Sequence, residues 1–548
     1  MAEDLNIVDI ASKGVVKDTP PIALAPNIFT DVRNVRFKDG AIRKMEGELL
    51  LNNIADELTG SLSHGKVRYF AVWQDPNLQP TGCYYIFVVD LLNNNIIVGQ
   101  KVYIQDHLGN KRDITPSTLN SGNGFTFSTD GWMHTLFNGG FTFIINNGIE
   151  KPHYIKDTPG NTNINNIVLA ELPGWDSYNV AQTTHSDTFS TGDSNVFDLG
   201  QKVDFAANSI SVTGTTTKNA QAGSPAGSGT VNGTNFVPGA LPGSTPSVTG
   251  DNFQIYTDAS TNTTVIVIGN LSNGNTVTVN VNSRNPVNVR CGVLEAFGNL
   301  LVAGDLTEID TSGNTIRRLS GVVRTSDVAA PGALPINWNP FEAGASTADE
   351  FTLSETSQIQ DMKPLQGNMY IYATDSIHAM RLTGNVNVPV SFAPVTDEYG
   401  ALTKGAVKEY DGKHFVVGRN DIYVFQGNPS NIQTLSGGRV QTYFFDNLNP
   451  IHENQLMLMQ NHLENEIWLC YPTLDSLAGE LDEVLIWNYR DNTWTIRDLN
   501  GVMSGDMGPV KGGGVPSATI ALTGNSGSFG YTNRGKKESV AVTINGKT

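Results

Sequence analysis

Short apolar runs separated by turn residues recur along most of the chain. In Trp132–Gly148 two such runs flank a turn at residues 138–140, and Gly292–Asp305 repeats the form with a turn at residues 298–299. Two strand-length runs joined by a Gly- or Asn-containing turn are typical of a β-hairpin. No segment sustains the i, i+3, i+4, i+7 spacing of an amphipathic helix over three turns. The pattern therefore predicts an all-β protein.

The hairpin units recur every ~40 to 50 residues, which is the spacing of β-propeller blades. Further units lie at Met362–Leu382, Lys408–Asn428 and Asp482–Asp498. They share a pattern rather than letters, because neither a repeated Trp-Asp dipeptide nor a kelch di-glycine signature is present. A β-sandwich or a series of barrels would give similar local patterns. We predict a distorted β-propeller core, since one propeller can absorb most of 548 residues.

Residues 185–285 differ from the rest of the chain in composition. Between Ala206 and Gly250 the only charged residue is Lys218, and Gly, Ser, Thr, Ala and Asn dominate. Two strand-like runs follow, Thr263–Asn270 and Thr276–Asn282. A disordered linker would lack them, so we interpret 185–285 as an inserted Gly/Ser/Thr-rich β-domain; the alternative is a plain flexible insertion. The propeller then occupies 1–184 and 286–500, and the Gly-rich segment 501–548 supplies closing or partner-binding strands.

The charge balance argues against a surface that grips nucleic acid. The chain has 53 acidic and 35 basic residues, a formal net charge of −18, whereas nucleic-acid binding needs clustered Lys and Arg. An acidic wall would instead let DNA pass without adhering. The three cysteines are far apart and odd in number, which favours buried thiols and folding in a reducing cytoplasm. The sequence shows neither a secretory signal nor an apolar run long enough to span a membrane.

Motifs that would carry hydrolytic or metal chemistry are incomplete. His452 and Glu453 begin like a zinc-protease helix, but Leu456 occupies the position of the second ligand. The stretch Ser128–Trp132 resembles the Asp-box of sialidase-like propellers, although its spacing is wrong and a turn capped by Asp130 explains it better. Neither a nucleophile elbow nor a phosphate-binding loop is present. We therefore expect a protein that is not an enzyme, with no catalytic residue, metal or cofactor.

Paired carboxylates and clustered aromatics have simpler explanations than catalysis or sugar binding. Asp397-Glu398 are adjacent, and adjacent residues on a strand point to opposite faces. Four aromatic residues fall within one hairpin unit, where packing between strands is favoured over sugar stacking. These residues are Trp468, Trp487, Tyr489 and Trp494.

The N-terminal arm, Pro20–Gly47, resembles the N-terminal signature of the tail nozzle proteins of short-tailed phages. This family is also called tail tubular protein B or packaged-DNA stabilisation protein. The signature has a Pro-rich start, an aromatic-x-Asp, an Asn-x-Arg-aromatic, an Asp-Gly and a basic-x-x-x-Gly close. The matching positions are Pro20, Pro21, Phe29, Asp31, Asn34, Arg36, Phe37, Asp39, Gly40, Arg43 and Gly47.

Two later segments, Ser391–Asn428 and Asp482–Asp498, are similar to further segments of the same family. Together with the N-terminal arm they span nearly the whole chain apart from 185–285, which departs from the minimal family pattern. The matching positions are Asp397, Gly400, Asp411, Gly412, Tyr489 and Trp494.

The resemblance implies a structural virion protein that forms the distal tail tube, retains packaged DNA and conducts it during ejection. It implies a homo-hexameric ring below a tail adaptor protein, with tail fibres at the side as candidate partners of 185–285. Double-stranded DNA would pass through the lumen without sequence-specific binding. The protein would be assembled in the cytoplasm of the host bacterium and reside in the virion tail.

We expect the lumen of such a ring to be lined mainly by acidic and neutral polar residues, with few basic ones. The alternative is a virion-associated glycan-binding or sialidase-like propeller, which needs aromatics and carboxylates clustered on a concave face. A bacterial surface adhesin is a third interpretation, and it predicts a secretion signal that this sequence lacks.

Overall fold

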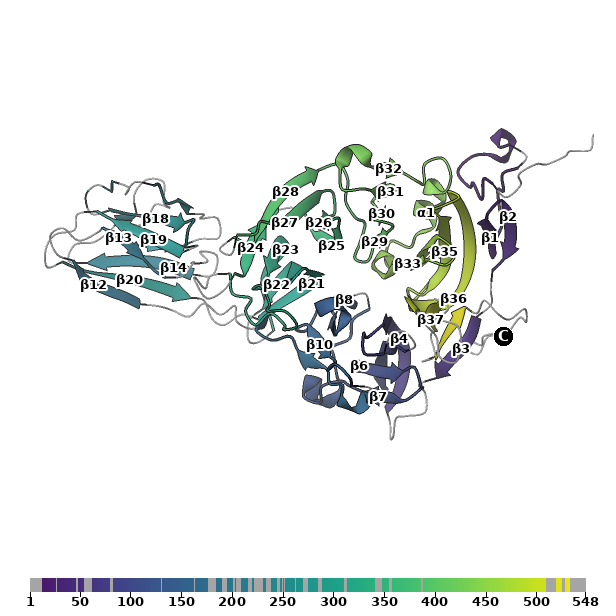
Figure 1. Ribbon diagram of the computed structural model, residues 1–548, viewed down its shortest axis with the longest axis horizontal. Coiled ribbons are helices and arrows are strands. Elements are labelled where there is room, and N and C mark those ends of the chain that lie inside the picture. Colours follow the sequence, from purple (N-terminus) through teal and green to yellow (C-terminus); the bar gives the residue numbers. More distant parts are fainter. Residues whose placement is uncertain are drawn as a thin grey trace, which may run out of the picture.

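The regular secondary structure of the computed structural model is nearly all β, mostly in antiparallel sheets, and most of the sheets stand side by side in a ring (Figure 1). The structure describes residues 12–532 except 26, 46–47, 54–61, 79–81, 130, 162, 176–183, 190–194, 201–202, 204–207, 215–218, 221–229, 233–237, 244–246, 249, 251, 262, 270–274, 284–287, 310–312, 341–346, 354–356, 386–387, 509–518 and 525–527.

Five blades of the ring are four-stranded antiparallel sheets in which each strand pairs with the next one along the chain. Blade 1 contains β4 (Leu62–Trp73), β5 (Tyr84–Asn93), β6 (Ile96–Asp106) and β7 (Lys111–Asp113). Blade 2 contains β8 (Met133–Phe137), β9 (Thr142–Asn146), β10 (His153–Lys156) and β11 (Ala170–Glu171). Blade 3 contains β21 (Asn288–Phe297), β22 (Leu300–Ile309), β23 (Thr315–Thr325) and β24 (Asp349–Thr352). Blade 4 contains β25 (Ile359–Leu365), β26 (Asn368–Ala373), β27 (Ile377–Leu382) and β28 (Val390–Thr396). Blade 5 contains β29 (Val407–Tyr410), β30 (Lys413–Val417), β31 (Ile422–Phe425) and β32 (Gln433–Thr434).

A seven-stranded sheet completes the ring, and one long strand divides it into two blades. The strand is β36 (Thr493–Gly508): its first half pairs with β35, and its second half pairs with β37 and packs against β4. Blade 6 contains the first half of β36 together with β33 (Met457–Asn461), β34 (Glu466–Tyr471) and β35 (Leu481–Asn488). Blade 7 contains the second half of β36 together with β37 (Thr519–Gly524), β38 (Ser528–Thr532) and β3 (Glu48–Asn53).

Strands from the N-terminal and C-terminal parts of the chain meet in blade 7 and close the ring. Strand β3, from the N-terminal part, pairs antiparallel with β38, with Glu48 opposite Thr532. On the inner side the backbone N–H groups of Phe70 and Val72 in β4 donate to the side chains of Ser504 and Asp506 in β36, at 3.1 and 2.9 Å. This pairing ties the N-terminal part of the chain to its C-terminal strands.

A separate β-sandwich is inserted between blades 2 and 3 and projects from the ring (Figure 1). One of its sheets contains β12 (Thr184–Phe189), β20 (Asn275–Ser283), β14 (Asn208–Gly214) and β16 (Thr230–Asn232). The other contains β13 (Val196–Asp198), β19 (Thr263–Ile268), β18 (Asn252–Asp258), β15 (Asn219–Ala220) and β17 (Gly239–Ala240). Ile210 and Val279 of the first sheet share a buried core with Ile255 and Ile266 of the second. The prediction of an all-β propeller with an inserted small β-domain is confirmed.

Local sequence explains why these segments form hairpins. The turn between β29 and β30 is Asp411-Gly412, whose φ angles are 43° and 70°. Asp and Gly tolerate positive φ, as a two-residue hairpin turn requires. Blade strands are packed on both faces, so β5 is buried continuously from Tyr84 to Leu91, unlike a strand with one face in water.

Helical structure is a minor component of the described residues. The α-helix among them is α1 (Gln441–Asn447), between blades 5 and 6. Short 3₁₀ turns are η1 (Pro21–Ala23), η2 (Leu119–Gly122), η3 (Asn138–Gly140), η4 (Ile164–Asn166), η6 (Pro429–Asn431) and η7 (Glu453–Gln455).

Candidate functional site

The N-terminal arm lies along blade 6, outside the ring (Figure 1). Pro20 precedes η1, and Pro21 is its first residue, where a missing backbone N–H costs nothing. The hairpin of β1 (Val35–Lys38) and β2 (Ala41–Lys44) turns at Asp39-Gly40, with φ angles of 52° and 70°. The turn falls on the Asp-Gly pair of the family signature.

A buried ion pair connects β1 to blade 6. The Arg36 side chain donates from Nε to Oε1 of Glu466 and from Nη2 to Oε2, the latter at 3.2 Å. Arg36 is 4% exposed and Glu466 is 1% exposed. Trp468 Nε1 also donates to Glu466, at 2.9 Å. Burial raises the pKa of Glu466, and the Arg36 guanidinium opposes that rise.

Residues just before β1 attach the arm to β36 as well. The backbone N–H of Asn34 donates to the carbonyl of Ile496 at 2.9 Å, and its side chain donates to Asp498 at 3.0 Å. Arg33 donates to Asp498 at 2.5 Å and to Glu483 at 2.8 Å. Arg33 is not among the positions that match the family. Its partner Glu483 is 450 residues away in the sequence, so no local pattern indicated the role of Arg33.

The other matched positions of the arm have local structural contacts. Asp31 forms an exposed ion pair with Lys17, at 2.8 Å. The rings of Phe29 and Phe37 lie 5.4 Å apart, which places Phe29 against the buried Phe37. Gly47 lies outside the described residues.

The structure places the matched residues of Ser391–Asn428 at two turns. Asp397 is exposed in the turn after β28. A Cβ atom on Gly400 would lie 2.3 Å from the carbonyl oxygen of Ala373, so only glycine fits there. Asp411 and Gly412 form the β29–β30 turn, where the Gln366 side chain donates to the Gly412 carbonyl at 3.1 Å.

The three segments that carry the family resemblance meet in one hydrophobic core. Phe37 of the arm, Tyr410 and Phe415 of Ser391–Asn428, and Trp487 and Trp494 of Asp482–Asp498 belong to the same buried cluster. The ring of Trp487 lies 5.6 Å from the rings of Tyr410 and of Phe415. Segments separated by hundreds of residues are therefore parts of one structural unit.

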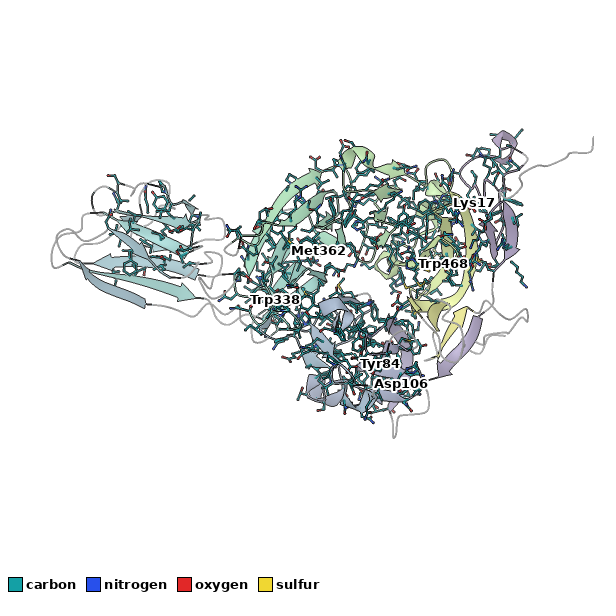
Figure 2. All side chains as sticks on the ribbon, viewed as in Figure 1. Lys17, Tyr84, Asp106, Trp338, Met362 and Trp468 are labelled. Carbon is teal, nitrogen blue, oxygen red and sulfur yellow. The ribbon has the colours of Figure 1, made fainter. Side chains whose placement is uncertain are left out.

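The aromatic residues of blade 6 are packing residues. Trp468 and Trp494 are each 1% exposed, and Trp487 is 4% exposed. Tyr489 is partly buried, with its ring 5.2 Å from that of Tyr410. Figure 2 places Trp468 among the side chains of blade 6. This arrangement agrees with the predicted packing between strands.

A polar cavity of about 720 Å³ lies where loops of several blades meet. Asp305 and Arg318 of blade 3 line it together with Lys404, Arg419 and Glu453 from segments of later blades. Lys404 approaches Asp305 to 3.2 Å and Arg318 approaches it to 3.9 Å. Asp305 has a φ of 52° at a β-bulge of β22, a backbone conformation that is uncommon for a residue other than glycine.

A second cavity of about 210 Å³ is lined by the first strands of several blades, so it follows the ring axis. Within it Lys363 contacts Glu295 at 2.5 Å and Asp361 at 3.8 Å. Burial raises the pKa of Asp361 to about 6, although the Lys363 ammonium opposes that rise. Burial lowers the pKa of His134, whose Nδ1 lies 2.5 Å from the Tyr69 hydroxyl. Lys363 therefore faces two carboxylates, and His134 is held separately by Tyr69.

Among the described residues, those that the sequence offered for metal or thiol chemistry are not assembled into a site. Across the described residues, no group of three or more His, Cys, Asp and Glu side chains is placed to hold a metal ion. The three cysteines form no disulfide, and burial raises the pKa of the Cys83 thiol to about 11 and that of Cys291 to about 12. His452 and Glu453 lie at the start of η7, a single turn without a second ligand at Leu456. Asp130 lies outside the described residues.

None of the helices in the described ranges is long and apolar enough to cross a membrane.

Comparisons with known proteins give fold-level similarities only. No family model matches the chain, and no curated protein matches it. Among solved structures, the β-propeller domain of Cps50 (Swd1) from Myceliophteria thermophila aligns with 88% of this chain and 98% of its own, at 7% identity and a TM-score of 0.32. Saccharomyces cerevisiae Sqt1 aligns with 89% of this chain and 99% of its own, at 9% identity and a TM-score of 0.35.

Proposed function

We propose that the chain is a tail nozzle protein of a short-tailed phage, a structural subunit of the tube through which DNA leaves the particle. The observation that carries the proposal is the shared core of the three segments that resemble this family. Phe37, Tyr410 and Trp487 come from different segments and pack together in that core. A resemblance produced by unrelated local patterns would have no reason to converge in space.

The conduit of this proposal lies between copies of the chain and not inside one propeller. The cavity along the propeller axis has only about 210 Å³, and Lys363 in its wall is paired with Glu295 of the neighbouring blade. A DNA duplex, whose major groove alone is about 12 Å wide, does not fit such a space. A ring of six chains, as the family resemblance implies, would supply a lumen of sufficient width.

The charge of the chain suits a channel that DNA passes without being retained by contact. The formal net charge is −18, and DNA carries about one negative charge per 1.7 Å of its axis. Like charges repel, so an acidic lumen would keep the duplex away from its wall. A lumen lined by Lys and Arg would bind the backbone and oppose sliding.

The inserted sandwich is the candidate contact for a side partner such as a tail fibre. It spans β12 to β20 and projects from the ring between β11 and β21 (Figure 1). Its core is separate from those of the blades. A projecting domain can therefore contact a neighbour without disturbing the propeller, while the ring itself would dock on the tail adaptor.

The alternative, a glycan-binding or sialidase-like propeller, would use the cavity of about 720 Å³. Sugar sites use aromatic faces for stacking, and the described lining of this cavity contains none. The aromatic residues of blade 6 are buried in the wall. The site therefore gives the glycan hypothesis no specific support.

Two measurements on the purified full-length chain distinguish these functions. Light scattering after mild cross-linking, over a range of protein concentrations, is expected to show six chains of 59.0 kDa per particle. A glycan array is expected to show no binding, and a sialidase assay no turnover. A chain that stays monomeric or trimeric and binds glycans would contradict the nozzle function.

A further inference from the structure

The interface between blades 1 and 2, called the joint below, contains two buried carboxylates without a compensating positive charge. Asp75 follows β4 of blade 1 and is 0% exposed, and Asp157 follows β10 of blade 2 and is 2% exposed. Hydrogen bonds between Asn77 and residues 158 and 160 hold the two loops together, and burial with the neighbouring Asp157 raises the pKa of Asp75 to about 7. Within the described ranges neither carboxylate has a Lys, Arg or His partner. Two ionised carboxylates in such a place repel each other unless a cation lies between them.

In each carboxylate, one oxygen accepts hydrogen bonds from the protein and the other accepts none. Asp75 Oδ1 accepts from the backbone N–H of Asn77 at 2.9 Å. Asp157 Oδ1 accepts from the backbone N–H of Thr158 at 2.7 Å and from Asn161 Nδ2 at 2.6 Å. The Oδ2 atoms of both residues are buried and receive no hydrogen bond. Buried oxygens without a donor are uncommon, so these two Oδ2 atoms are candidates to bind a ligand.

Two buried hydroxyl groups nearby are unsatisfied as well. Tyr84 is 1% exposed, its hydroxyl has no hydrogen-bond partner, and it lies in the electrostatic field of Asp157, Asp75 and the more weakly acting Asp106. Thr142 is 0% exposed, and its Oγ1 has no partner. It directly follows Phe141, whose carbonyl accepts from the Asp157 backbone N–H at 3.2 Å. Figure 2 places Tyr84 in blade 1, on the sheet that contains β4.

Hydrogen bonds across the joint already fix the loops that carry the two carboxylates. Asn77 donates from its side chain to the Thr158 carbonyl at 3.1 Å and accepts from the Gly160 backbone N–H at 2.9 Å. Trp73 Nε1, in β4, donates to the Gly140 carbonyl of blade 2 at 2.7 Å. The oxygen atoms are therefore held in place before any ligand binds.

We propose that Asp75 and Asp157 bind one Ca²⁺ ion at the joint between blades 1 and 2, with the Tyr84 hydroxyl facing the ion. The pair supplies a charge of −2 through oxygen atoms only, which suits a hard divalent cation. Calcium accepts irregular oxygen geometries, whereas Mg²⁺ demands a near-ideal octahedron and Zn²⁺ prefers nitrogen and sulfur. The bound ion links the two blades and stiffens the ring at this joint.

The test uses the full-length chain after treatment with EDTA and dialysis. Isothermal titration with CaCl₂ is expected to show one ion bound per chain, and the Tm is expected to rise with calcium concentration because the ion binds the folded state. MgCl₂ at the same concentrations is expected to give a smaller rise. Bound Tb³⁺ should luminesce on excitation of the Trp73–Tyr84 pair, whose rings lie 5.3 Å apart, and Ca²⁺ should displace it.

The variant Asp157→Asn is expected to abolish calcium binding and the calcium-dependent rise in Tm. Its amide can donate to Asp75, so without calcium the variant should be at least as stable as the wild type. Asp106→Asn is the matched control, because Asp106 is buried and acidic but both its oxygens already accept hydrogen bonds, from Leu108 and Asn110. This control should retain the calcium response. If Asp157→Asn does not fold, displacement of Tb³⁺ by Ca²⁺ in the wild type is the measurement that tests the proposal.

An absence of calcium heat, Tm shift and terbium luminescence in the wild type would overturn the proposal. A calcium response that persists in Asp157→Asn would also overturn it, because the ion would then bind elsewhere. If the pair holds a proton instead of a metal, the wild type will be stabilised by acid and insensitive to calcium, which contradicts the calcium site.

Discussion

Replacing Arg36 by methionine is expected to detach the N-terminal arm from blade 6 while the ring stays folded. The substitution keeps an apolar stem but leaves the Glu466 carboxylate, 1% exposed, without its guanidinium partner. Removing one member of a buried ion pair typically costs about 3 to 5 kcal/mol. The cost should appear as a lower free energy of opening for the arm.

Hydrogen exchange of the amides in β1 (Val35–Lys38) and β2 (Ala41–Lys44) measures that opening directly. A global unfolding curve would be less informative, because a chain with a propeller and an inserted domain need not unfold in one step. A loss of about 3 kcal/mol corresponds to exchange that is faster by about two powers of ten. Amides in the inserted sandwich should exchange at an unchanged rate.

A double-mutant cycle separates the ion pair from general damage. Arg36→Met and Glu466→Gln are each expected to destabilise the arm, and the double variant should lose less than the sum of the two. Lys17→Met is the control, because it breaks an ion pair whose Asp31 side chain is 64% exposed. Exposed pairs contribute about 0.2 to 1 kcal/mol. Additive losses, or equal losses in Arg36→Met and Lys17→Met, would refute the role of the buried pair.

Three further outcomes follow from individual residues. Burial lowers the pKa of His414 to about 4, below its ordinary value of 6.5, so this group's contribution to stability is present above pH 6.5 and is lost as pH falls through 4; His414→Gln should flatten the acid limb of a Tm-against-pH curve, by an amount equivalent to up to roughly 3 kcal/mol in the free energy of unfolding. Gly400→Ala should cost about 1 to 3 kcal/mol, because its Cβ would lie 2.3 Å from the Ala373 carbonyl oxygen; an unchanged Tm would contradict this. Removing β37 and β38 by ending the chain at Gly508 should expose β3 and open the ring, measured as increased proteolysis near Glu48.

The hairpins and the inserted domain could be predicted because their signals are local. Asp39-Gly40 and Asp411-Gly412 specify turns with positive φ, and the alternation in Thr276–Asn282 specifies the strand β20. Each of these features depends on residues close together in the sequence. Periodicity at the blade spacing then indicated the propeller.

The sequence suggested closing or partner-binding strands in 501–548, but neither the strand that they pair with nor the charge pairs could be predicted, because both join distant residues. Strand β3 pairs with β38, so that Glu48 lies opposite Thr532. No local sequence pattern predicts this pairing. The number of blades could not be counted from the sequence. Strand β36 is shared by two blades, but one strand of 16 residues looks like part of one hairpin. The Asp75–Asp157 pair arises only when blades 1 and 2 stand side by side.

Electron microscopy of the assembled chain tests the nozzle function most directly. We predict a ring or tube of six propellers, with the inserted sandwiches outside and a central lumen wide enough for duplex DNA. Its wall should be lined mainly by Asp, Glu and neutral polar residues. A compact trimer with outward-facing grooves, or a ring whose lumen is lined by Lys and Arg, would contradict the account.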